Sequence, residues 1–178
     1  MYKMKKVFMT LVAAVMAVSA SAQVYVGGGV GIGSMDNGGD NNTTTYKFVP
    51  EIGYNFNSDW AVGTTFGWKG SNHGGAKSIE FSPYVRYTFF HTRFINGFID
   101  GTVGYTHDYG ANKRDIDHLQ IGFRPGVAVN LTPCLSFMTK VGFVGYNHTK
   151  NNNTKAKSDG WGVDIDGNNV VFGLYYNF

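Results

Sequence analysis

The chain has 178 residues, of which only 15% are charged, whereas typical soluble domains have about 25%. It contains 25 glycines, and 16% of its residues are aromatic. The formal net charge of +3 comes from Lys3, Lys5 and Lys6, because residues 23–178 hold 12 basic and 12 acidic residues. The basic balance of the whole chain therefore gives no reason to expect nucleic acid as a partner.

Residues 1–22 have the pattern of a cleaved signal peptide. The three lysines precede an apolar run from Val7 to Ser19, which is shorter than the ~20 residues that a spanning helix needs. Ala20-Ser21-Ala22 fits the small-x-small cleavage pattern. We therefore expect a signal peptide over 1–22 and one domain over 23–178. The single cysteine, Cys134, cannot form an internal disulfide.

The remainder alternates between apolar residues and small or polar residues, which predicts strands and not helices. Eight such segments follow in chain order: Val24–Gly33, Thr45–Phe56, Trp60–Lys69, Lys77–Phe90, Ile95–Asp108, Asp117–Leu131, Leu135–Tyr146 and Asn169–Phe178. Three of the connections are short, namely 57–59, 91–94 and 132–134. Four are longer and polar, namely 34–44, 70–76, 109–116 and 147–168. Short turns at one rim and long loops at the other are typical of membrane β-barrels.

The two faces of each segment differ in size as well as in polarity. Along Asp117–Leu131, one face carries Phe123 and Val127 and the other carries Gly122 and Gly126. A narrow barrel of eight strands has an interior just wide enough for side chains to fill. We therefore predict that the large apolar side chains point outward to lipid and the small or polar ones point inward. Burial of Phe81, Phe123, Val127 and Phe172 in one shared core would contradict this.

Three prolines, Pro50, Pro83 and Pro125, fall inside the predicted strands. Proline cannot donate a ladder hydrogen bond, so we expect a bulge or a missing bond at each, on the outward side of the pleat.

By alternation, six charged residues point inward, and three are acidic and three basic: Glu51, Glu80, Arg86, Asp100, Arg124 and Lys140. A buried unpaired charge is costly, so we expect these side chains to pair with one another, with Gln120 and Asn130, or with water. The hypothesis is an ion-pair plug that fills the lumen. The alternative is a narrow channel with porin-like conductance.

The chain resembles the small outer-membrane β-barrels of the OmpA/OmpX type. The resemblance rests on the eight alternating segments, the asymmetry of the connections and the ending Gly173-x-x-Tyr176-x-Phe178. That ending resembles the signal read by the barrel-assembly machinery. The resemblance implies a monomeric eight-stranded up-and-down barrel in the outer membrane, in contact with lipid and lipopolysaccharide, and no common enzymatic activity. The asymmetry places the long loops outside the cell and both termini in the periplasm.

Other candidate sites are weaker. The glycine run Gly27–Gly33 lacks the spacing of a phosphate-binding loop, and Asp164-x-Asp166-x-Asn168 lacks the glycine and the closing glutamate of a calcium loop. A lipid A-modifying enzyme is a second alternative function. Its site would come from His107, His118 and His148, whose nearby hydroxyls are Thr106 and Thr149. We predict no catalytic, cofactor or metal site.

Overall fold

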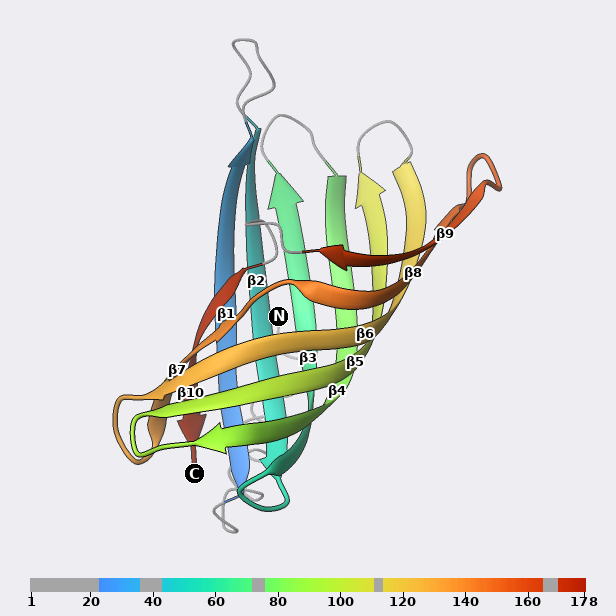
Figure 1. Cartoon of the computed structure of the whole chain (residues 1–178). Coiled ribbons are helices and arrows are strands. Elements are labelled where there is room, and N and C mark those ends of the chain that lie inside the picture. Colours follow the sequence, from blue (N-terminus) through green and yellow to red (C-terminus); the bar gives the residue numbers. More distant parts are fainter. Residues whose placement is uncertain (1–22, 36–42, 72–75, 111–113, 165–169) are drawn as a thin grey trace, which may run out of the picture.

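The computed structural model describes residues 23–35, 43–71, 76–110, 114–164 and 170–178, and these residues form an antiparallel β-sheet (Figure 1). The predicted signal peptide lies outside the described residues. The strands are β1 (Val24–Met35), β2 (Thr43–Asn55), β3 (Trp60–Ser71), β4 (Ala76–His91), β5 (Ile95–Gly110), β6 (Arg114–Asn130), β7 (Leu135–Lys140), β8 (Phe143–Asn151), β9 (Lys157–Asp164) and β10 (Val171–Asn177). No helix among these residues has the length and apolar character needed to cross a bilayer.

The sheet closes on itself. Neighbouring strands follow the order β5-β4-β3-β2-β1-β10-β7-β6, and β5 also pairs with β6. β6 pairs with β7 at one end and with β8 at the other, so β7 and β8 are two halves of one barrel strand. The predicted eight-stranded antiparallel barrel is confirmed.

The last long connection differs from the prediction. Residues 147–168 were expected to form a loop, but β8 continues to Asn151 and β9 follows over Lys157–Asp164. β9 pairs with β8 from Lys150↔Lys157 to Phe143↔Asp164. The resulting hairpin extends beyond the barrel wall in Figure 1.

The prolines lie where pairing is interrupted, as predicted. β2 pairs with β3 at Phe48 and next at Glu51, so Pro50 has no partner on the β3 side. β4 pairs with β5 at Phe81 and next at Tyr84, so Pro83 has no partner on the β5 side. Opposite Pro125 the register shifts by one residue between β7 and β8. Gly142 fills this bulge with φ 71°, a left-handed conformation that favours glycine.

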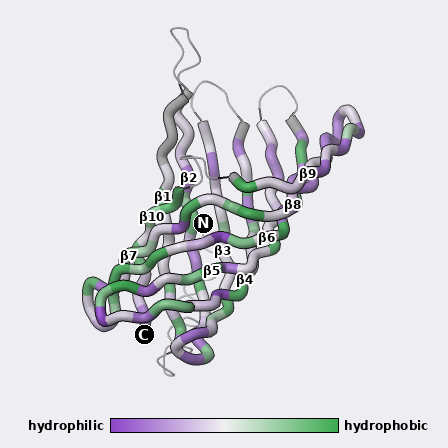
Figure 2. The backbone as a smooth tube through the Cα atoms, viewed as in Figure 1, coloured by the Kyte–Doolittle hydropathy of each residue, from purple (hydrophilic) through white to green (hydrophobic). Residues whose placement is uncertain are grey.

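The large apolar side chains point away from the barrel interior. Phe81, Phe123, Val127 and Phe172 are 46%, 55%, 47% and 49% exposed, so they share no core. Figure 2 shows hydrophobic stretches along the barrel wall and hydrophilic residues at the short turn 57–59. The predicted outward orientation is confirmed, and the exposed apolar surface is of the kind that lipid covers.

The three short turns are closed in the same way. The side-chain oxygens of Asn57, Thr92 and Thr132 each accept a hydrogen bond from the backbone N–H three residues later, at 2.8, 2.8 and 3.0 Å. These bonds satisfy donors that the strand ladders leave free. They fix the lengths of the hairpins and therefore the register of the inward side chains.

Inward aromatic rings lie over glycines of the adjacent strand. Tyr25, Tyr84, Tyr175 and Phe98 pair in register with Gly53, Gly63, Gly27 and Gly126 respectively. A Cβ added at any of these glycines would meet the facing ring. The interior glycines are therefore needed because they leave the space that the rings occupy.

This packing predicts a difference between two glycines. A Cβ at Gly27 would lie 2.6 Å from Tyr175 Cγ and 2.7 Å from the Leu174 carbonyl oxygen, whereas a Cβ at Gly160 meets nothing within 4 Å. We expect Gly27→Ala to lower the free energy of unfolding by ~1–3 kcal/mol and Gly160→Ala to change it by less than about 0.5 kcal/mol. Urea titration in lipid vesicles measures both. Equal effects would contradict the ring-over-glycine packing.

Candidate functional site: charges and tyrosines across the lumen

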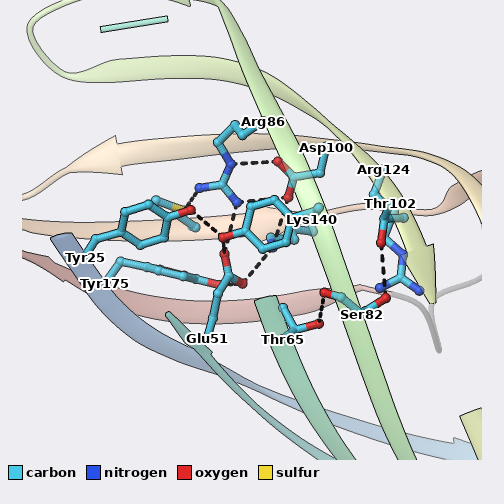
Figure 3. Close-up of polar contacts among 12 residues, drawn as sticks. Tyr25, Glu51, Thr65, Ser82, Arg86, Asp100, Thr102, Arg124, Lys140 and Tyr175 are labelled. Carbon is cyan, nitrogen blue, oxygen red and sulfur yellow. Dashed lines mark hydrogen bonds and ion pairs between the residues drawn. The ribbon is translucent and has the colours of Figure 1, made fainter. Parts of the chain in front are cut away.

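Four charged side chains from four strands meet inside the barrel (Figure 3). They are Glu51 of β2, Arg86 of β4, Asp100 of β5 and Lys140 of β7, and we call them the four-charge cluster. Arg86 donates to Asp100 through Nε at 2.7 Å and Nη2 at 2.9 Å, and to Glu51 Oε1 through Nη2 at 3.1 Å. Lys140 Nζ lies 2.7 Å from Glu51 Oε2 and 3.0 Å from Asp100 Oδ2. Each charge therefore contacts both opposite charges.

Three tyrosine hydroxyls complete this arrangement. Tyr84 donates to Glu51 Oε1 at 2.5 Å, and Tyr175 donates to Glu51 Oε2 at 2.8 Å. The hydroxyls of Tyr25 and Tyr84 also share a hydrogen bond. Each carboxylate oxygen of Glu51 thus accepts one tyrosine hydroxyl and one cationic donor.

Aromatic rings surround the Arg86 guanidinium. Its Cζ lies 4.0 Å from the centroid of Phe98 and 5.1 Å from that of Tyr84. A cation over an aromatic face is attracted by the ring quadrupole, more strongly where water is excluded. Nη1 also lies 3.4 Å from Met138 Sδ. The rings that lie over glycines therefore also hold this guanidinium in place.

All four charges are buried. Burying a charge costs several kcal/mol unless it is paired and hydrogen-bonded. Two acids and two bases leave the cluster formally neutral, and the contacts above satisfy both carboxylates. Together with the three tyrosines, these side chains form one hydrogen-bonded and ion-paired network inside the barrel.

A second cluster lies nearer the rim with the long connections. Glu80 contacts Lys47 Nζ at 2.9 Å and Arg124 Nη1 at 3.4 Å. Arg124 also donates to Gln120 Oε1 at 3.3 Å. These side chains are less buried than the four-charge cluster, with Lys47 at 20% and Arg124 at 21% exposed.

The structure separates the six sequence-predicted residues into two groups. Glu51, Arg86, Asp100 and Lys140 form the first cluster, whereas Glu80 and Arg124 belong to the second. Arg124 pairs in register with Asp100, but its guanidinium donates hydrogen bonds to Glu80 and Gln120. Asn130 bonds instead to Asn96 and Ser136.

Sequence reasoning missed Lys47 and the three tyrosines. Lys47 lies on the same strand and the same face as Glu51, so the alternation that places Glu51 inward also identifies Lys47 as an inward residue. Tyr25 lies on the inward face, where most side chains are small. The alternation of residues along the strand predicts this position, but it does not indicate that the Tyr25 hydroxyl reaches Tyr84 and the surroundings of Glu51. That contact depends on barrel closure.

Cavities flank the four-charge cluster on both sides. Towards the long connections, a cavity of about 210 Å³ is lined by charged side chains that include Lys47, Lys69, Glu80 and Arg124. Towards the short turns, a cavity of about 380 Å³ is lined largely by uncharged polar side chains that include Asn55, Asn96, Asn130 and Asn177. The lumen is therefore wide enough for water on either side of the cluster.

The residues of the predicted assembly signal lie on the outer side of β10 or within its ladder. Tyr176 and Phe178 are exposed, and their rings meet edge to face with centroids 5.0 Å apart. Gly173 packs against the backbone of Gly28, whose carbonyl oxygen would lie 2.8 Å from an added Cβ. Their role in assembly remains a prediction.

The cluster predicts an asymmetry between two arginines. Arg86→Met leaves two buried carboxylates with Lys140 as their remaining cation, so we expect it to lower the free energy of unfolding by ~3–5 kcal/mol. Arg93→Met, at an exposed turn, serves as the matched control and should change it by less than about 0.5 kcal/mol. Urea titration in vesicles measures both. An Arg86→Met effect as small as that of the control would show that the cluster does not hold the fold together.

Comparisons with known proteins agree with this architecture. The family model described as outer membrane protein beta-barrel domain matches residues 7–178. The crystal structure of Neisserial surface protein A (NspA) is similar in fold, with a TM-score of 0.55 and 11% sequence identity over 88% of this chain and 97% of that one.

A de novo designed transmembrane β-barrel matches with a TM-score of 0.42 and 14% identity over 88% of this chain and 96% of that one. No curated protein matches the sequence. The family model covers nearly the whole sequence, and the structure is a closed barrel with an apolar outer face. The chain therefore belongs to the outer membrane protein β-barrel domain family.

Proposed function

We propose that this outer-membrane barrel has a structural or surface-interaction role and that its lumen is closed. The observation that supports a closed lumen is the four-charge cluster with its three tyrosines, which joins β1, β2, β4, β5, β7 and β10 across the interior. A continuous path of water through the lumen would require these ion pairs to separate. Each separated charge would then bear its desolvation cost without a compensating partner. The protein is proposed to act through its surface and not as a pore.

The long connections are proposed to face the cell exterior, with both termini in the periplasm. The β8–β9 hairpin then presents Lys150, Lys155 and Lys157 at the outer rim, and all three are exposed. Ammonium groups at this level suit the phosphates of lipopolysaccharide. We further propose that the protein is a monomer surrounded by lipid, that the barrel-assembly machinery inserts it, and that it has no enzymatic activity.

A narrow channel is the alternative. The cavities on either side of the cluster favour it, because a rearrangement of one layer of side chains would join them.

Recording in planar bilayers separates the two functions. We expect no steady open-channel current from the unmodified barrel. The double variant Tyr84→Ala/Tyr175→Ala removes two rings from the cluster and should give measurable openings. The control Tyr87→Ala/Leu174→Ala alters outward side chains of the same two strands and should stay closed. A steady, large current from the unmodified barrel would replace the closed-lumen proposal with a channel.

A second alternative, a lipid A-modifying enzyme, is favoured by one arrangement at the rim of the lumen. His118 Nδ1 lies 3.0 Å from Thr149 Oγ1, and His118 Nε2 lies 3.4 Å from Asp108 Oδ2. A hydroxyl, an imidazole and a carboxylate in series can activate a nucleophile.

Mass spectrometry of lipid A incubated with the purified barrel tests this alternative. We expect no mass change, either with the unmodified protein or with Thr149→Ala. A mass change that Thr149→Ala abolishes would establish catalysis and contradict the non-enzymatic proposal.

A further inference from the structure

The outer face of the barrel carries the same three-residue arrangement twice. In β5, Tyr105 and His107 both contact Asp117 of β6, with Tyr105 Oη and His107 Nδ1 each 2.8 Å from Asp117 Oδ1. In β8, Tyr146 and His148 contact Asp159 of β9 in the same way. Each histidine pairs in register with its aspartate. The strand pattern Tyr-x-His facing Asp is therefore repeated in two hairpins.

The two copies differ at one position. Two residues before Asp117 the first copy has Asp115, whereas two residues before Asp159 the second copy has Lys157. Asp115 Oδ1 lies 4.0 Å from His107 Nδ1. The first copy therefore brings an imidazole nitrogen and two carboxylates together, with ligand atoms that all lie within 4.8 Å of one another. The second copy has a cation in place of the second carboxylate.

A fourth side chain links the first copy to the β8–β9 turn. Asn152 Nδ2 lies 2.8 Å from Asp115 Oδ1 and 2.8 Å from Asp117 Oδ2. The backbone N–H of Asn152 also donates to the Asp115 carbonyl oxygen at 3.0 Å. These bonds hold both carboxylates in place and tie the turn to β6.

The first copy lies beyond the apolar part of the barrel wall. Outward residues change from Val103 and Ile121, which are exposed and apolar, to His107 and Asp117 towards the long connections. There His107 is 41% and Asp115 46% exposed, so ions from solution can reach them.

We infer that His107, Asp115 and Asp117 bind a divalent transition metal, with Zn²⁺ the best fit. An imidazole nitrogen with two carboxylate oxygens is a donor set suited to zinc, whereas calcium and magnesium favour oxygen ligands alone. Ligands about 2.0–2.2 Å from a zinc ion lie roughly 3–4 Å apart. His107 Nδ1 lies 2.8 Å from Asp117 Oδ1, with which it shares a hydrogen bond, and 4.0 Å from Asp115 Oδ1, so a zinc ion would replace the proton of that hydrogen bond and would require only small movements of the side chains. Solvent would supply the remaining ligand. The three residues come from two strands, and their proximity depends on hairpin register, so the sequence alone predicts no metal site.

Bound metal would join β5 and β6 at the rim and, through Asn152, would hold the β8–β9 turn. This gives a consequence that can be measured separately from affinity. Lys155 lies in the turn and Lys157 is the first residue of β9, and trypsin can cleave after both. Metal binding should slow cleavage there.

The test uses the full mature chain, folded in detergent micelles without an affinity tag and titrated with zinc chloride in a calorimeter. We expect one zinc per chain. Asp115→Asn and His107→Ala should each weaken binding by about tenfold or more. The matched controls Asp159→Asn and His148→Ala, in the second copy, should leave the affinity within about twofold. A heat-dependent shift on gels confirms that each variant is folded.

Trypsin provides the second measurement. Zinc should slow cleavage at Lys155 and Lys157 in the unmodified chain and leave the rate unchanged in Asp115→Asn. The proposal is overturned if Asp115→Asn binds zinc as tightly as the unmodified chain, or if the second-copy variants lose binding equally. Binding of calcium that is as tight as zinc, and insensitive to His107→Ala, would also overturn it.

Discussion

The structure depends on the mutual pairing of four charges inside a narrow barrel. Glu51, Arg86, Asp100 and Lys140 come from four strands, and removing any one leaves two like charges that share a single opposite charge. Since a buried unpaired charge costs several kcal/mol, the cluster favours a single register for those strands. The contacts that specify the fold are the same contacts that are proposed to block the lumen, so structure and proposed function share one physical cause.

The glycines make this cluster possible. The lumen of an eight-stranded barrel has little spare volume, and four inward rings can occupy it only because glycines face them across the ladder. Those rings then supply hydroxyls to Glu51 and aromatic faces to Arg86. A composition rich in both glycine and aromatic residues is therefore explained by one packing arrangement.

Much of the fold could be predicted from the period-two alternation. It identified the barrel and the outward position of Phe123 and Val127, and the missing backbone N–H of proline indicated the interruption of pairing at Pro50, Pro83 and Pro125. It failed for residues 147–151 and 157–164, because the glycines and polar residues of β9 have the composition of a loop, and the strand forms by pairing with β8. Alternation placed Arg86 and Asp100 on the inward face, but it does not tell how far a long side chain reaches. The separation of Arg124 from the first cluster and the tyrosine contacts of Glu51 therefore required the structure.

The central claim is that large apolar side chains face lipid while small and polar ones fill a closed interior. Nitroxide labels placed one at a time from Leu119 to Ala128 of β6, in a Cys134→Ser background, test it most directly. In lipid vesicles, collision with oxygen should be high at odd-numbered positions such as Phe123 and Val127 and low at even-numbered positions such as Gly122 and Ala128. Uniform collision rates, or the opposite alternation, would contradict the account.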